Sequence, residues 1–280
     1  MIGIWLDGLD HVRYTVGMVS DVPERAANLR ERLVRAAGCL TGRNEDSGRG
    51  RARRWWASGN EWETKLGRCG VSTGAVHEWF GEEGPEDRKA KGWWPPLCLL
   101  ADVARRVARG APTGSRVVWI GKRVWVYPWA RGVKGILERS IFVDPPGPGE
   151  RVWAVDVALR CRGVAVVVAD GSGLKMAESR RLQLAAAAGG VMGLLARPGW
   201  ELCELSAAKT RWRVTPERSE TSGARWSVEL LRCKEANPVP EGQRRWSVTY
   251  EKGDVGVAAA AGDGPAGAAG SGGATRGVVA

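Results

Sequence analysis

Histidine is almost absent from this sequence, and its cysteines lack the spacing of a structural site. Only two histidines, His11 and His77, occur in 280 residues, and neither has a partner at ligand spacing. The six cysteines are widely separated and include no C-x-x-C pair. We therefore expect no metal site and no disulfide framework, and we interpret the cysteines as free thiols in a reducing compartment.

Long uncharged apolar stretches are also missing. No such run reaches the roughly 18 residues of a membrane span, except for a C-terminal stretch that holds too much glycine to cross a bilayer. The first residues, MIGIWLDGLDHVRYTVGM, contain acidic side chains and no basic leader, so we expect no signal peptide. These absences predict a cytoplasmic protein without a membrane partner.

A third absence concerns the phosphate-binding loop. Residues 76–94, VHEWFGEEGPEDRKAKGWW, begin like the strand that precedes such a loop. The loop requires G-x-x-x-x-G-K-[ST], in which backbone N–H groups and a lysine face the phosphates. Counting from Gly81 puts Glu86, Asp87 and Arg88 where glycine, lysine and serine or threonine belong. Two carboxylates would repel a triphosphate, so we expect a degenerate loop and no cofactor.

Positive charge is abundant instead. Forty-two Lys and Arg residues stand against 31 Asp and Glu residues, which gives a formal net charge of +11 and a pI near 9.8. This balance favours a polyanionic partner, either nucleic acid or an acidic protein. The alternative is that a genome of high GC content encodes arginine in place of lysine.

The chain divides into three regions. Residues 1–54 hold an amphipathic helical pattern at 20–40 and a Gly-, Ser- and Arg-rich linker at 41–54. Residues 55–258 have the composition of a packed core domain. The whole chain is 44% hydrophobic, which is enough for such a core. Residues 259–280 are rich in Ala and Gly, and we expect them to form a disordered tail.

The core domain has the pattern of an α/β fold. Short apolar runs predict strands, and helical periodicity between several of them is typical of a mostly parallel sheet. The last part of the domain alternates with period two, which predicts an antiparallel extension of the same sheet. The predicted strands are residues 74–80, 116–121, 140–144, 164–170 and 191–197, the helices are 95–109, 151–161 and 177–190, and the extension comprises 209–215, 224–234 and 244–251.

This domain resembles the ImuA family of SOS mutagenesis proteins, which is grouped with RecA and the SulA-type proteins. The resemblance covers residues 55–250 and is carried by the order of GAVHEWFG, SRVVWIGKRVWVYP, VWAVDVALRC, SRRLQLAAAAGG, TRWRV and RWSVELLR. It implies a RecA-like core in an accessory protein of translesion DNA synthesis. The implied partners are an ImuB-type polymerase-like protein, RecA and an error-prone replicative-type polymerase, with DNA as a further ligand at the nucleoid.

The resemblance also locates the remaining nucleotide motifs. Aligned on RecA, Arg123 takes the position of the catalytic glutamate, so the carboxylate that activates water is missing. Asp170 ends VAVVVAD where a Walker B aspartate would coordinate magnesium. We favour a turn or cap role for Asp170, because the metal would have no phosphate to bridge. The resemblance therefore implies a domain that has lost ATP hydrolysis and has no catalytic residue.

Two basic segments are candidate interfaces. The first segment is either a nucleic-acid interface, in which arginines pair with phosphates and tryptophans stack on bases or sugars, or only a solvated linker. It comprises Arg49, Arg51, Arg53, Arg54, Trp55 and Trp56. The second lies in the antiparallel extension, where adjacent Arg and Trp positions predict Trp inward and Arg outward. These positions are Arg211, Trp212, Arg213, Arg225, Trp226, Arg244, Arg245 and Trp246. We assign partner binding to the edge that holds Arg232, Lys234, Arg244, Arg245 and Tyr250.

Two other functions remain open. A RuvC-like, two-metal nuclease requires four scattered carboxylates to converge, namely Asp156, Glu204, Glu251 and Asp254. The segment VWAVDVALRC, however, fits a helix better than the strand that this fold needs. A SulA-like cell-division inhibitor would share the core and bind a cytoskeletal GTPase. Arg180 and Arg181 are expected to pair with carboxylates such as Glu178.

Overall fold

A computed structural model describes residues 2–4, 14–16, 71–83, 92–126, 135–219, 223–234, 244–251 and 254–259. The predicted helix at 20–40, the basic segment from Arg49 to Trp56 and the tail from residue 260 onward lie outside these ranges. Two short strands, β1 (Ile2–Ile4) and β2 (Tyr14–Val16), pair with each other and are not anticipated by the sequence pattern. Within the described ranges, no helix is both long and apolar enough to cross a membrane.

One mixed sheet organises the described part of the chain, with strands in the order β12, β11, β10, β9, β3, β8, β7, β5, β6. Six strands pair in parallel: β3 (Val76–Glu83), β5 (Arg116–Ile120), β6 (Ser140–Val143), β7 (Val164–Asp170), β8 (Met192–Pro198) and β9 (Thr210–Glu217). Three strands continue antiparallel from β9: β10 (Ala224–Cys233), β11 (Arg245–Glu251) and β12 (Asp254–Ala259). The predicted mostly parallel sheet with an antiparallel C-terminal extension is confirmed.

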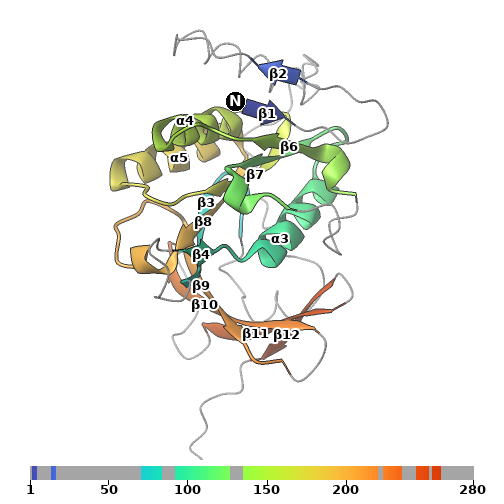
Figure 1. Ribbon diagram of the computed structural model, residues 1–280, viewed down its shortest axis with the longest axis vertical. Coiled ribbons are helices and arrows are strands. Elements are labelled where there is room, and N and C mark those ends of the chain that lie inside the picture. Colours follow the sequence, from blue (N-terminus) through green and yellow to red (C-terminus); the bar gives the residue numbers. More distant parts are fainter. Residues whose placement is uncertain are drawn as a thin grey trace, which may run out of the picture.

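In the described part of the chain, three helices cover the parallel strands. Helix α3 (Leu97–Gly110) packs on one face, and α4 (Pro148–Leu159) and α5 (Met176–Gly189) lie together on the other (Figure 1). Pro148 occupies the first turn of α4, where its missing N–H costs no hydrogen bond. Gly190 ends α5 with φ at 69°, a left-handed conformation that favours glycine. All three predicted helices of the core domain are therefore present.

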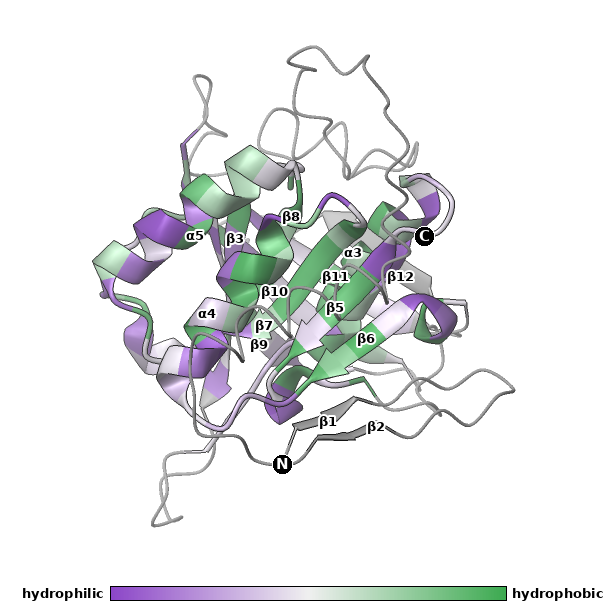
Figure 2. Ribbon diagram, turned by 90° about the horizontal axis from the view of Figure 1, so that it is seen from above, coloured by the Kyte–Doolittle hydropathy of each residue, from purple (hydrophilic) through white to green (hydrophobic). Residues whose placement is uncertain are grey.

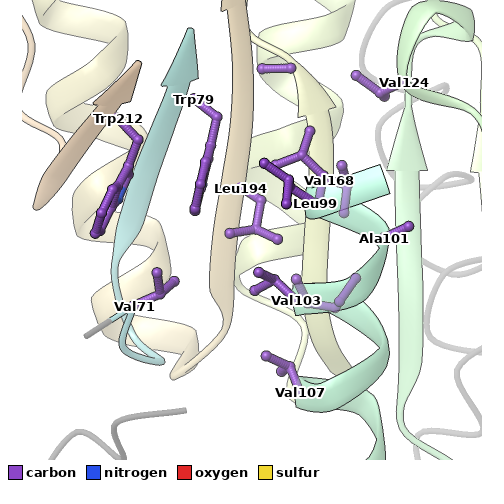
Figure 3. Close-up of a cluster of buried hydrophobic side chains, with 14 of the residues drawn as sticks. Val71, Trp79, Leu99, Ala101, Val103, Val107, Val124, Val168, Leu194 and Trp212 are labelled. Carbon is purple, nitrogen blue, oxygen red and sulfur yellow. The ribbon is translucent and has the colours of Figure 1, made fainter. Parts of the chain in front are cut away.

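The period-two alternation of the strands creates two hydrophobic cores. On the α3 face, Trp79 of β3 stacks on Trp212 of β9 with ring centroids 5.2 Å apart, beside Leu99 and Val103 of α3 (Figure 3). On the other face, a second core lies beneath α4 and α5. In Figure 2 the central strands are mainly hydrophobic, and α4 and α5 also carry hydrophilic segments. Each buried large side chain contributes about 1.5–3 kcal/mol, so both faces stabilise the sheet.

Strand β12 lies at the end of the predicted core domain. The predicted domain ends at residue 258, and β12 ends at Ala259. The strand pairs with β11 along its whole length. Such pairing needs only backbone N–H and C=O groups, so a segment of small side chains can still form an edge strand.

A candidate site at the carboxyl ends of the parallel strands

Ligands of open α/β sheets bind beyond the carboxyl ends of the parallel strands. At this edge Asp170 ends β7, Gly121 follows β5, and Gly81 lies near the end of β3. The degenerate nucleotide site that the family resemblance implies stays a prediction, and this edge is where it would lie.

Donor groups surround both carboxylate oxygens of Asp170. Its Oδ1 accepts from the backbone N–H of Ser172 at 2.9 Å and from the Ser172 hydroxyl at 2.6 Å. Its Oδ2 lies 3.4 Å from Nη1 of Arg151 and 3.7 Å from Nε of Arg123. The bond to the N–H two residues ahead is the Asx turn that strand-end aspartates commonly form. Asp170 therefore stabilises a turn and carries two cationic neighbours.

Arg123 joins three elements at this edge. It lies in the short 3₁₀ helix η1 (Lys122–Val124), directly after β5. Its Nη1 donates to the carbonyl of Trp93 at 3.1 Å, and its guanidinium carbon lies 5.1 Å from the centroid of the Trp93 ring. Trp93 belongs to the two-residue strand β4 (Trp93–Trp94). The Arg123 guanidinium thus connects β4 with Asp170, the carboxylate at the position where the resemblance would place a magnesium ligand.

Strand β3 does not turn at Gly81. It continues to Glu83 and pairs antiparallel with β4, with Glu82 opposite Trp94. A Cβ atom on Gly81 would lie 2.0 Å from the carbonyl oxygen of Trp94, so only glycine permits this close approach of two backbones. The expectation that Gly81 opens a loop is wrong, because it serves strand pairing. Glu86, Asp87 and Arg88 lie outside the described residues.

A second group of charges lies deeper, on the side of the sheet that faces α5. Glu78 of β3 has no exposed surface, and its two oxygens accept from Nη1 of Arg197 and Nε of Arg211, each at 2.9 Å. The hydroxyl of Ser206 donates to Oε1 at 2.7 Å. Burying a carboxylate is tolerated only when its charge is paired and its oxygens are hydrogen-bonded, and Glu78 meets both conditions.

Both arginines extend this network to the chain that follows β8. Nη2 of Arg197 lies 2.6 Å from Oε2 of Glu201, and Arg211 donates to the carbonyls of residues 201 and 202. The ring of Phe80 lies 5.7 Å from the Arg197 guanidinium and 4.7 Å from that of Arg211. The network therefore holds residues 199–206 against the end of the sheet.

Sequence reasoning missed this network and placed Arg211 on the solvent side, which is wrong. One signal was available: Glu78 shares a side of β3 with the apolar residues Val76 and Phe80, so its side chain had to be buried. Its partners gave no signal, because Arg197 and Arg211 lie 119 and 133 residues away in the chain.

Asp156 forms a third charged group, between α4 and α5. Its Oδ2 lies 3.0 Å from Nη2 of Arg181, and its Oδ1 lies 3.2 Å from Nη2 of Arg160. Burial acts to raise the pKa of Asp156, but hydrogen bonds from Arg181 and Arg160 outweigh it and hold this pKa below its ordinary value. Arg181 thus pairs with a carboxylate of the neighbouring helix, whereas Glu178 accepts the backbone N–H of Lys175 at the start of α5.

The structure does not bring together the carboxylates of the nuclease alternative. Asp156 lies in a helix that packs on β7, whereas Glu251 ends β11. Five strand spacings of about 4.8 Å separate β7 from β11, which amounts to about 24 Å. Within the described part of the chain, no group of three or more His, Cys, Asp or Glu residues could hold a metal ion.

Comparison with known proteins addresses the family directly. No model of a known protein family matches the chain. Two sequences named Protein ImuA, from two strains of Caulobacter vibrioides, are each 31% identical to it over 186 residues. The matched region spans 60% of this chain and 74% of the relative. The chain belongs to the ImuA family. The resemblance seen in the order of its segments is confirmed.

Two residues of the edge to which we assign partner binding are used within the fold. Nη2 of Arg232 donates to the carbonyl of Ser206 at 2.8 Å, and Nζ of Lys234 donates to that of Ala207 at 2.8 Å. Burial, followed by the charge of Arg211, lowers the pKa of Arg232. Burial, followed by the charge of Arg232, lowers the pKa of Lys234. Both cations thus stabilise residues 206–208, and partner binding through them stays a prediction.

The other residues of this edge lie on or beside β11. The Arg245 side chain is 60% exposed, and its Nη2 lies 3.4 Å from Oε2 of Glu229. The carbonyl of Arg244 accepts from the N–H of Leu230, and the ring of Tyr250 lies 6.4 Å from that of Trp226. Arg245 is therefore accessible to a partner at this edge.

The predicted alternation of Trp and Arg holds for most of the extension. Trp212 and Trp246 are buried in the core on the α3 side, and Trp226 is half-buried beside it. The side chains of Arg213 and Arg225 are 44% and 43% exposed. The residues Arg49, Arg51, Arg53, Arg54, Trp55 and Trp56 lie outside the described ranges, so their role in nucleic-acid binding stays a prediction.

Proposed function

We propose that this member of the ImuA family is a non-catalytic, RecA-like accessory protein of SOS-induced translesion DNA synthesis that acts beside an ImuB-type polymerase-like partner. Family membership supports the role in mutagenesis after DNA damage. A mostly parallel sheet covered by helices on both faces, with an antiparallel C-terminal extension, is consistent with a RecA-like core.

The observation that carries the non-catalytic part is the environment of Asp170. Arg123 and Arg151 approach the carboxylate that would have to coordinate magnesium. Two like charges about 4 Å apart repel each other by about 4 kcal/mol at the effective dielectric of a protein surface. A divalent cation would therefore have to displace both guanidinium groups, and Arg123 is also held by Trp93.

Calorimetric titration of the full chain with ATP and magnesium tests this part. We expect no saturable binding in the micromolar range, because the metal position is occupied by positive charge. The matched variant is D170A, which removes the only carboxylate proposed for the metal. Magnesium-dependent ATP binding that D170A abolishes would show that the site is functional and that the proposal is wrong.

Copurification with an ImuB-type protein from the same genome tests the accessory role. We expect a stable complex that forms equally with and without ATP. If the chain instead copurifies only with a cytoskeletal GTPase, the SulA-like alternative replaces this proposal.

A further inference from the structure

The antiparallel extension has a polar face opposite its tryptophans. Across β9, β10 and β11, Glu229 lies between Arg213 and Arg245 in register. Its Oε2 is 3.4 Å from a guanidinium nitrogen of each arginine. The three side chains are 44%, 27% and 60% exposed in the order of the strands. They therefore form a row of charges on an open side of the sheet.

A second row follows along the same face. Nε of Arg225 lies 3.0 Å from Glu217 and donates to the hydroxyl of Ser247 at 2.7 Å. Ser227 lies in register between Thr215 and Ser247, so hydroxyl groups fill the space between the two charged rows. The face combines guanidinium and hydroxyl donors.

Positive charge is in excess on this face. Its described side chains include two carboxylates, Glu217 and Glu229, and five cations, which are Arg213, Arg225, Arg232, Lys234 and Arg245. The buried arginines beneath it, Arg197 and Arg211, are balanced by Glu78 and Glu201. After burial, neighbouring cations are the next cause of the lowered pKa values of Arg232 and Lys234, which is consistent with a positive local potential.

We propose that the polar face of β9, β10 and β11 binds the phosphate backbone of duplex DNA. Exposed ion pairs contribute at most about 1 kcal/mol, so the arginines can turn from Glu217 and Glu229 to phosphates at little cost. Serine and threonine hydroxyls are common additional donors to phosphate. The tryptophans that these described strands carry lie on the opposite face, so they are not placed for the stacking that single-strand binding uses. The inference names a ligand for the proposed accessory function and rests on it for the biological setting.

Fluorescence anisotropy with a labelled duplex of arbitrary sequence tests the proposal on the full chain. The variant R213Q/R225Q should weaken binding by about tenfold or more at about 0.1 M salt. The slope of log affinity against log salt should become shallower by about 1.8, which is about 0.9 for each lost phosphate contact. E229Q removes a carboxylate from the face and should strengthen binding by about threefold.

The matched control is R109Q/R180Q, which removes two exposed arginines from α3 and α5 and causes the same loss of net charge. Equal weakening by the two double variants would reduce the effect to overall charge and overturn the proposal. It is also overturned if R213Q/R225Q loses affinity for polyglutamate but not for duplex, since the face would then recognise an acidic protein. If duplex binding fails while copurification with the ImuB-type protein persists, this surface is wrong and the proposed function stands.

Discussion

Glu78 is a carboxylate with no exposed surface in the middle of the sheet, and three donors satisfy it. Buried ion pairs often contribute little net stability compared with apolar groups of the same shape. Removal of one partner is costly, however, because the remaining charges stay buried without compensation. The network is therefore better understood as a positional constraint on residues 199–206 than as a large source of stability.

The E78Q variant tests this at the level of one residue. Gln keeps the shape but not the charge, so Arg197 would keep only Glu201 as a carboxylate partner and Arg211 would lose its ion pair with Glu78. The free energy of unfolding should therefore fall by about 3–5 kcal/mol. The control is E217Q, whose carboxylate pairs with Arg225 on the surface and should cost at most about 1 kcal/mol. Urea denaturation of the full chain measures both. Equal stability of the two variants would contradict the constraint.

Asp156 gives the stability of the domain a pH dependence. Its pKa in the folded chain is lowered, so it lies below the unfolded value of about 3.9. Stability from this group is therefore present above the unfolded pKa and is lost as the pH falls through the folded pKa. The difference in unfolding free energy between the wild type and D156N should shrink as the pH decreases from about 6 to about 3. A difference that stays constant in thermal melts over this range would rule out the paired carboxylate as its source.

At the scale of elements, the hairpin of β3 and β4 depends on Gly81. A Cβ there would overlap the carbonyl of Trp94, which is backbone and cannot rotate away. We expect G81A to lower the free energy of unfolding by about 1–3 kcal/mol, the usual cost of overpacking. G149A is the matched control, because a Cβ at this position in the first turn of α4 meets nothing within 4 Å. Chemical denaturation should show no loss for G149A and a gain of up to about 1 kcal/mol.

The sequence predicts the elements whose signal is local. The valine-rich run that ends at Asp170 is a buried parallel strand, and the proline before Leu97 precedes a helix, because apolar periodicity and chain breakers act over a few residues. Strand β4 could not be predicted, since two residues carry no periodicity and their pairing with β3 is set by tertiary contact. Leu184 shows that local pattern can also mislead: it is an apolar residue of a helical segment, yet it is 59% exposed.

The candidate site was predictable only in part. The position of Asp170 at a strand end and its turn role follow from local sequence, since its partner Ser172 is two residues away. Its contacts with Arg123 and Arg151 depend on how three elements meet in space, which the spacing of residues does not encode. The burial of Arg211 could not be predicted for the same reason. Its side chain alternates with Trp212 as predicted, but residues 201 and 202 cover its side of the sheet.

At the scale of the whole molecule, the two faces of the antiparallel extension have different roles. Its tryptophan face continues the core that α3 covers, so β9 to β11 are fixed by apolar burial on one side only. The opposite face is then available for polar contacts without loss of stability. A chain with a net charge of +11 thereby presents cations on a rigid sheet, where they lose little conformational freedom when a ligand binds.

The last prediction concerns where the ImuB-type partner binds. Binding hot spots need anchors such as Trp, Tyr or Arg, and after Gly256 only Arg276 is of these types. Deletion of residues 261–280 should therefore leave partner affinity within about tenfold of the full chain. Charge reversal in R244E/R245E should weaken binding by about 2 kcal/mol or more, because Arg245 is 60% exposed at the sheet edge and its charge would become repulsive to an acidic partner.

Biolayer interferometry with the immobilised partner measures both changes, and thermal melts verify that R244E/R245E remains folded. R213Q/R225Q serves as the control, since it changes the duplex-binding face while Arg244 and Arg245 stay intact. Retained partner affinity in this variant would show that the partner does not need Arg213 and Arg225, whereas Arg245 belongs to both surfaces. If the truncation abolishes binding while R244E/R245E has no effect, the interface lies in the tail, and the basic edge of the extension serves only the fold and the DNA.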